Sequence, residues 1–163
     1  MHPTSIFIFA LLPVCDGLFG LGRLQSVAVT GTLRCNGKPA SRVSVKLSDK
    51  EIFHSKELKK GRTNQNGTFY LSGSKREFSH IEPFVNVYHT CNYDGPCLKK
   101  RKFKIPVEYV TYGPFPNYTF DLGIKNLDGI YSDQWIVCTN RSIDRNLLLN
   151  IEFYAPNPND TLF

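Results

Sequence analysis

Histidine and cysteine are the residue types most suited to chemistry in this sequence, and their spacing argues against catalysis. His54, His80 and His89 are scattered, and none is flanked by a partner at catalytic spacing. The sequence has neither a Gly-X-Ser-X-Gly nucleophile motif nor a glycine-rich phosphate-binding loop. We therefore predict that the chain is not an enzyme and has no catalytic residue and no cofactor.

The cysteines indicate disulfides rather than a metal site. His89, Cys91 and Cys97 could form part of a zinc site, but cysteines in an oxidising compartment are usually bridged and lack the thiolates that zinc needs. Four cysteines follow residue 22, which allows three connectivities. We predict a Cys91–Cys97 bridge, which would close a short loop, and a Cys35–Cys138 bridge, which would tie the C-terminal segment to the first strand.

A basic run offers the other candidate chemistry, which is anion binding. Its cationic side chains are Lys99, Lys100, Arg101, Lys102 and Lys104. On a strand, alternate lysines of this run would share one outward face while Phe103 and Ile105 point inward. Such a ribbon could bind phospholipid headgroups or sulfated glycans. Alternatively, the run is a solvated strand at a sheet edge, where lysines discourage aggregation.

The first 22 residues are typical of a cleaved leader. Residues 6–14 are nearly unbroken apolar, and the small residues Cys15, Gly17, Gly20 and Gly22 follow. This pattern indicates a signal-peptide core with cleavage between residues 17 and 22, although a basic start is missing. The alternatives are a buried strand and an uncleaved anchor. We predict a secreted protein without a transmembrane segment, because no later segment reaches the length of a membrane span.

Length, charge and glycosylation sequons fit a small extracellular domain. The chain has 163 residues, enough for one domain with a real core, and a formal charge of +6. This mild basic excess favours anionic surfaces as partners, and secretion argues against nucleic acid. The candidate glycosylation sites, each in an Asn-X-Ser/Thr sequon, are Asn66, Asn117, Asn140 and Asn159.

Alternating apolar residues predict short β-strands in the first half of the chain. Residues 27–35 and 43–47 both alternate, and Asn36-Gly37 marks the reversal between them. A second turn at residues 64–67 precedes another alternating strand. The pattern is lost in residues 48–60, which we predict to be a charged loop.

The alternation continues in the second half of the chain. Residues 84–90, 102–106 and 118–127 read as further strands, the last with Phe120, Leu122 and Ile124 on one side. Roughly seven short strands separated by frequent turns predict an all-β, antiparallel sandwich.

Taken together, these motifs resemble the transthyretin-like family of secreted nematode proteins. The motifs that carry the resemblance are Val29-Thr30-Gly31-Thr32-Leu33-Arg34-Cys35, Gly37-Lys38-Pro39-Ala40, Val87-Tyr88-His89 before Cys91, Pro96-Cys97 and Lys104-Ile105-Pro106. The resemblance implies a transthyretin-like (prealbumin-like, Ig-like) β-sandwich of about seven to eight strands over residues 23–127, and an extracellular location. Residues 128–163 would then be a C-terminal extension with one or two strands and a frayed tail.

The resemblance also brings an enzyme into consideration. Hydrolases of 5-hydroxyisourate are relatives. Their active sites look like a set of His, Arg and His residues, completed by a C-terminal Tyr-Arg-Gly-Ser sequence. This chain ends with Asp160-Thr161-Leu162-Phe163 and lacks that tetrapeptide. We therefore predict a non-enzymatic binding protein that recognises a cell-surface lipid, glycan or receptor. The alternative is an extracellular carrier of small apolar ligands, by analogy with transthyretin.

Overall fold

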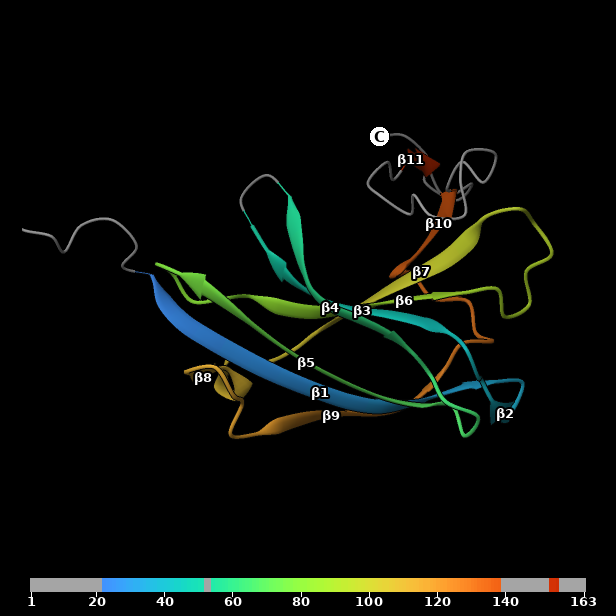
Figure 1. The fold of residues 1–163 in the computed structure, drawn as a ribbon. Coiled ribbons are helices and arrows are strands. Elements are labelled where there is room, and N and C mark those ends of the chain that lie inside the picture. The colour runs from blue at the N-terminus through green and yellow to red at the C-terminus, as the bar shows by residue number, and fades with distance from the viewer. Residues whose placement is uncertain (1–21, 52–53, 139–152, 156–163) are drawn as a thin grey trace, which may run out of the picture.

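The computed structural model describes residues 22–51, 54–138 and 153–155. In this part of the chain the regular structure is β, apart from one short 3-10 turn, and two sheets stack face to face (Figure 1). The all-β sandwich predicted from the sequence is confirmed. The predicted leader up to residue 21 lies outside the described residues, as do the sequons Asn140 and Asn159. No helix of the described residues has the length and apolarity needed to cross a membrane.

The strands and the 3-10 turn η1 follow one another along the chain. In order they are β1 (Arg23–Cys35), β2 (Lys38–Pro39), β3 (Ser44–Lys50), β4 (Ser55–Arg62), β5 (Thr68–Glu77), β6 (Pro83–His89), β7 (Leu98–Lys104), η1 (Val107–Tyr109), β8 (Thr111–Tyr112), β9 (Thr119–Asn126), β10 (Gln134–Cys138) and β11 (Phe153–Ala155). One sheet gathers β2, β5, β8 and β9 around β1, and the other has the order β11-β10-β7-β6-β3-β4. Paired strands are antiparallel except β1 and β9, which run parallel.

β1 is the central strand of the first sheet. One of its edges pairs with β5 from Arg23↔Glu77 to Thr32↔Thr68, and the other pairs with β9. Its alternate apolar residues face the second sheet and are completely buried. The inward side chains of both sheets form one core, which includes Val27, Val29, Leu33, Val45, Leu47, Phe69, Leu71, Val85, Val87, Ile105, Leu122 and Leu127.

The Asn36-Gly37 turn forms as predicted, but the strand that follows it does not return along β1. Both residues have positive φ, 51° and 75°, as a tight hairpin turn requires. The return lasts for only Lys38 and Pro39 in β2, and β3 then pairs with β4 and β6 in the other sheet. Alternation identifies a strand, but it does not identify the strand's partner.

Most of the described residues between 48 and 60 lie in β3 and β4, so the predicted charged loop is wrong. β3 continues to Lys50, and β4 pairs with it from Ser44↔Arg62 to Lys50↔Ser55. β4 ends the six-stranded sheet on one side, so most of its side chains are in solvent. Its Leu58 packs against the core. An edge strand exposed on both faces has little apolar alternation for a sequence pattern to reveal.

A β-bulge in β9 turns Ile124 outward. The β1–β9 register shifts by one residue between Asp121 and Ile124. Gly123 lies at the shift with φ 71°, and its N–H donates to Asp121 Oδ1 at 2.8 Å. The prediction that Phe120, Leu122 and Ile124 share the inward side is therefore wrong for Ile124, which is 57% exposed.

The structure contains two disulfides, and both predicted pairings are wrong. Cys97 is bonded to Cys138. The register between β7 and β10 places Leu98 opposite Val137, so the next antiparallel pair brings these two cysteines together, with Cα atoms 4.3 Å apart. The predicted link from Cys138 to the first strand fails because β10 joins the other sheet.

The second disulfide joins the two sheets. Cys35 ends β1, Cys91 follows β6, and their Cα atoms are 5.9 Å apart. The neighbouring side chains of Asn36 and Asn92 exchange two hydrogen bonds of 2.8 and 3.1 Å. The loop from Cys91 to Cys97 therefore has a disulfide at each end, one to Cys35 of β1 and one to Cys138 of β10. No disulfide joins its two ends to each other.

Candidate functional site

The pairings of β7 decide which way each residue of the basic run points. Arg101 and Phe103 lie opposite the core residues Val87 and Val85, so they are on the inward side of the sheet, as is Lys99 two residues earlier. The residues between them face outward, and these are Lys100, Lys102 and Lys104.

Two lysines from distant parts of the sequence join this outward set. Lys46 of β3 lies opposite Asn86 of β6, and Lys60 of β4 lies opposite Lys46. Since Asn86 is also opposite Lys102, one row crosses four strands that lie side by side in one layer (Figure 1). We define the lysine face as the outward side chains Lys46, Lys60, Lys100, Lys102 and Lys104.

Aromatic rings lie beneath the lysine face. Lys102 Nζ is 3.8 Å from the centroid of the Phe84 ring, and Lys46 Nζ is 5.4 Å from that of Tyr88. Ammonium groups at such distances are attracted to the negative face of a ring. Phe84 is only 3% exposed, so lysine stems cover apolar surface while their charges stay outermost.

Positive charge is concentrated on this face. Glu57 is paired with Lys46, with its carboxylate 3.5 Å from Lys46 Nζ. Burial lowers the pKa of Lys102, and the nearby charges of Lys50, Lys100 and Lys104 lower that pKa further, whereas the charge of Glu82 raises it. An anion beside Lys102 would relieve this repulsion, so the arrangement is suited to binding negative charge.

The alternative interpretation of the basic run as edge protection is wrong for the first half of β7 only. β6 pairs with β7 from Lys99 to Lys104, whereas the pairing with β10 covers Leu98 to Arg101. The strand that ends the sheet is β4, and its exposed Lys56, Lys59 and Lys60 supply the edge charges. Lys99, Lys100 and Arg101 thus lie in an internal part of the sheet, and Lys102 and Lys104 lie where β7 pairs with β6 alone among the described strands.

Arg101 has structural partners on the inward side. It is 7% exposed, and its guanidinium donates to Asn126 O at 3.3 Å and lies 3.4 Å from the carboxylate of Asp133. Its Cζ is also 3.5 Å from the centroid of the Tyr131 ring. These contacts attach the 126–133 loop to β7, so Arg101 belongs to the fold more than to a surface.

Lys99 is also occupied on the inward side. Its Nζ donates to the backbone oxygens of Cys91 and Asn92, both at 3.2 Å. It therefore braces the loop that carries the inter-sheet disulfide. Of the five cations predicted to bind anions, the structure brings Lys100, Lys102 and Lys104 together on the outer side of β7, away from Lys99 and Arg101, although Lys100 is only 7% exposed.

His89 is buried without a hydrogen-bond partner. It is 3% exposed, and neither ring nitrogen has a partner in the described structure. Burial, followed by the charges of Lys99 and Arg101, lowers the pKa of His89 to about 4, so the ring is neutral at pH 7. Cys91 and Cys97 are both in disulfides, so the zinc site drawn from these residues lacks its thiolates.

Lys75 holds three carboxylates together at the end of the sandwich where β1 begins. Lys75 Nζ lies 2.9 Å from Asp49 Oδ2 and 2.5 Å from Glu51 Oε1, and it also contacts Glu77. Carboxylate oxygens of these acidic residues lie within 4.8 Å of one another, as metal ligands do. The cation among them is the chain's own lysine, which makes this a structural ion cluster.

A cleft of about 470 Å³ adjoins this cluster and brings two of the scattered histidines to one place. His54 lines the cleft beside Glu51, with which it pairs, and His80 lines it near Ser79. The hydroxyl of Tyr112 is 3.3 Å from a ring nitrogen of His80. The cleft lies on the opposite side of the fold from Cys35 and joins no catalytic set predicted from the sequence.

The two sequons within the described residues are both at exposed positions. Asn66 lies in the β4–β5 turn, and Asn117 lies in the loop before β9. A glycan at either position would project into solvent. Their glycosylation remains a prediction.

Three residues of the candidate site were missed by the sequence analysis: Lys46, Lys60 and Asn86. The alternation Val45-Lys46-Leu47 does signal that Lys46 points outward. What it cannot signal is that β3 lies next to β6, or that β4 lies next to β3. The lysine face is created by pairing between strands, which no single stretch of sequence contains.

Comparison with known proteins identifies the family. The model of the transthyretin-like family matches residues 30–106. The chain is 40% identical to Transthyretin-like protein 5 of Caenorhabditis elegans over 135 residues, covering 80% of this chain and 96% of that protein. It is 36% identical to Transthyretin-like protein 2 of the same organism over 149 residues, covering 86% of this chain and 100% of that protein.

Among solved structures, the chain is similar to part of a 9R-lipoxygenase from Cyanothece PCC8801. The identity is 19% and the TM-score 0.36, over 63% of this chain and 16% of that one, a likeness too low to bear on fold or activity. The two relatives from Caenorhabditis elegans, by contrast, match over 96% and 100% of their own length. This chain therefore belongs to the transthyretin-like family.

Proposed function

We propose that this chain is a non-enzymatic extracellular binding protein that recognises an anionic group at a cell surface through the lysine face. The observation that carries the proposal is the convergence of lysines from β3, β4 and β7 on one side of one sheet. Family membership is compatible with a binding protein and names no partner. Lys60 and Lys104 are exposed, Lys46 and Lys102 are half-buried, and Lys100 is buried, so a partner can approach the first four without entering a cavity.

An extracellular location is supported by the cysteine chemistry. The structure has two disulfides, and such bonds are typical of proteins in oxidising compartments. The exposed sequons at Asn66 and Asn117 are compatible with the same compartment. The predicted leader would direct the chain there.

The alternative function, carriage of small apolar ligands, has less support. Clefts of about 470 and 300 Å³ occur in the described structure, and both have charged residues in their lining. A site for an apolar ligand is usually lined by apolar and aromatic side chains. Carriage in a channel between subunits would further require an oligomer, which size-exclusion chromatography with mass measurement would detect.

The proposal is tested with two variants of equal charge. Lys60→Glu/Lys104→Glu alters exposed positions of the lysine face, whereas Arg34→Glu/Lys38→Glu makes the same change of charge at exposed positions of the other sheet. We expect binding to phosphatidylserine vesicles and to immobilised heparin to weaken about tenfold or more for the first variant only, because each lysine near an anionic surface contributes about 1 kcal/mol. Raising the salt from low to physiological concentration should weaken wild-type binding as well. Equal binding by the two variants would overturn the proposal.

A further inference from the structure

An amide with an unpaired oxygen lies in the middle of the lysine face. Asn86 is 4% exposed, and its Oδ1 has no hydrogen-bond partner in the described structure. Buried side-chain oxygens nearly always have a partner, because removing them from water without one is costly. Since the unpaired oxygen of Asn86 does not stabilise the fold, its presence suggests a role in binding.

The two lysines nearest to Asn86 do not supply the missing hydrogen bond. Lys46 and Lys102 lie directly opposite it on the two neighbouring strands, within reach of its side chain. Their ammonium groups lean away in opposite directions along the sheet, over Tyr88 and Phe84 respectively. Asn86 therefore lies between two lysine stems with its acceptor unused.

The row through Asn86 defines what a ligand must offer. The row Lys102, Asn86, Lys46 and Lys60 presents cations on both sides of a hydrogen-bond acceptor, on strands about 4.8 Å apart. A matching ligand carries acidic groups for the lysines and a hydroxyl donor for the amide oxygen, and it is long enough to span several strands. Lysine stems are flexible, so an acidic ligand can draw the ammonium groups outward and uncover the amide.

We propose that the lysine face binds an acidic, sulfated sugar chain, whose sulfates contact Lys46, Lys60 and Lys102 and whose hydroxyl donates to Asn86 Oδ1. This inference rests on the proposed function and names its ligand class. A sugar chain combines anionic groups with many hydroxyl donors on one backbone. A phosphatidylserine headgroup has no hydroxyl: its phosphate and carboxylate offer acceptors only, and its ammonium group would be repelled by the lysines.

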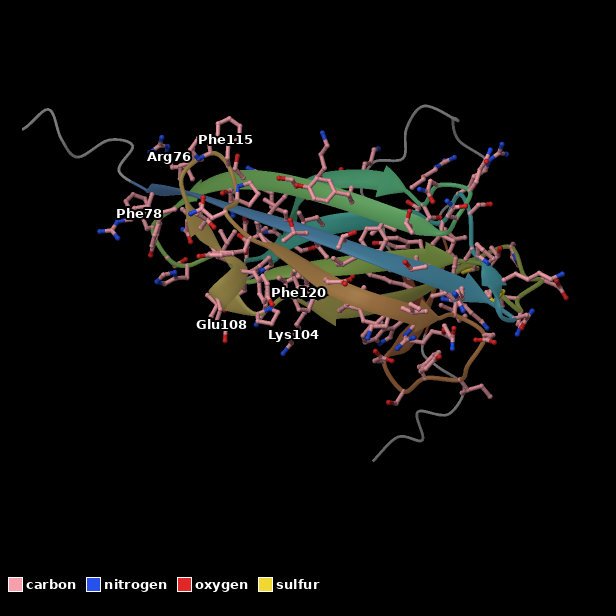
Figure 2. All side chains as sticks on the ribbon, turned by 90° about the horizontal axis from the view of Figure 1, so that it is seen from below. Arg76, Phe78, Lys104, Glu108, Phe115 and Phe120 are labelled. Atoms are coloured by element: carbon pink, nitrogen blue, oxygen red, sulfur yellow. A yellow bond between two sulfur atoms is a disulfide. The ribbon has the colours of Figure 1, made fainter. Side chains whose placement is uncertain are left out.

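The most exposed aromatic side chains lie away from the lysine face. Proteins that settle into a membrane interface present aromatic side chains there. On the outer side of this sheet Phe84 is covered, at 3% exposure, and Trp135, which lies opposite Lys100, is 37% exposed. Strongly exposed rings lie instead at the end of the sandwich where β1 begins, with Phe78 at 83% and Phe115 at 79% exposure (Figure 2).

The experiment compares three probes on wild type and on Asn86 variants. The probes are a heparin-derived sulfated oligosaccharide, the same oligosaccharide with its sulfates removed, and phosphatidylserine vesicles. The variant Asn86→Leu keeps the number and branching of the side-chain heavy atoms but removes the amide, Asn86→Val removes it with a residue that favours strands, and Ser48→Ala is a control at another buried polar position of the outer side. Affinities are measured by titration calorimetry and co-sedimentation, and melting temperatures by circular dichroism.

We expect wild type to bind the sulfated oligosaccharide at least tenfold more tightly than its desulfated form. Asn86→Leu should melt at or above the wild-type temperature, because an unpaired buried acceptor is removed, yet bind the oligosaccharide about fivefold more weakly. Ser48→Ala should bind as wild type does. Unchanged oligosaccharide binding by a folded Asn86 variant, or tighter binding to the vesicles than to the oligosaccharide, would overturn the inference. If Lys60→Glu/Lys104→Glu still weakens binding in that case, the proposed function stands and only the ligand class is wrong.

Discussion

The two ends of the sandwich are closed by different chemistry. At the end of β1, the Cys35–Cys91 disulfide joins the sheets, and paired Asn36 and Asn92 side chains reinforce it. At the start of this 13-residue strand the sheets are joined by ions: Lys75 of β5 donates to Asp49 of β3. One end is covalent and the other is electrostatic.

The surroundings of the two closures differ as well. At the ionic end the polar groups are satisfied: Gln25 donates to Ser79 O at 2.7 Å and accepts from the N–H of Ile81 at 3.1 Å. At the disulfide end His89 and Arg101 Nε are buried without hydrogen-bond partners in the described structure. A covalent link can hold sheets together over imperfectly paired polar groups, whereas an ion cluster cannot, because each unpaired charge there would cost several kcal/mol.

The largest expected effect comes from breaking the covalent end. Cys35→Ser/Cys91→Ser opens a link between positions 56 residues apart, for which the chain-entropy model gives a loss of about 4 kcal/mol in the free energy of unfolding. Urea unfolding under non-reducing conditions measures it. The control is Cys97→Ser/Cys138→Ser, which opens a link of 41 residues within one sheet and should cost a similar amount. Peptide mapping that finds Cys91 joined to Cys97 would contradict the structure.

The difference between the two ends also shows what the sequence could and could not predict. The fold class, the Asn36-Gly37 turn and the outward direction of Lys100 depend on local alternation and turn chemistry, and these predictions agree with the structure. Both disulfides depend on which strands are neighbours. A strand that contains Cys138 is predicted correctly, but the prediction places it beside the first strand, whereas it pairs with β7.

The candidate site follows the same division. The lysines of β7 were found because they are consecutive in the sequence, and their partners Lys46 and Lys60 were missed because two strand pairings bring them there. Asn86 could not be recognised, since its burial and its unpaired oxygen are properties of the packed sheet. The bulge at Gly123 is a further case, in which one inserted residue reverses the direction of Ile124.

The second largest effect should come from the ionic end. Burial alone would lower the pKa of Lys75, but hydrogen bonds to Glu51, Glu77 and Asp49 raise it overall, so the lysine stays charged. Lys75→Met leaves these carboxylates without their cation and should lower the free energy of unfolding at pH 7 by about 3 kcal/mol. Lys56→Met, at an exposed position, should change it by less than about 0.5 kcal/mol.

The pH dependence of the Lys75→Met effect provides its control. The hydrogen bond to Lys75 lowers the pKa of Glu51 below 4.5 in the folded state. The contribution of this carboxylate is therefore complete above pH 4.5 and is lost as the pH falls through the lowered pKa. The wild type and Lys75→Met should thus approach each other in stability on acidification. A difference that stays constant down to pH 3, measured by urea unfolding, would show that Lys75 acts by packing rather than by charge.

The smallest effect concerns His89 at the covalent end, and it falls in a different pH window. The pKa of His89 is about 4 in the folded protein against 6.5 when unperturbed, so the unfolded chain takes up a proton first on acidification. Stability should therefore fall between pH 6.5 and pH 4, by about 2 kcal/mol after allowance for relaxation around the ring. His89→Leu removes the titrating group and two unpaired nitrogens, so its stability should be nearly constant in this window. Because the Lys75 cluster loses stability only below pH 4.5, urea unfolding from pH 7 to pH 3 separates the two ends. Parallel pH profiles for wild type and His89→Leu above pH 4.5 would show that the buried ring is not what makes the covalent end sensitive to acid.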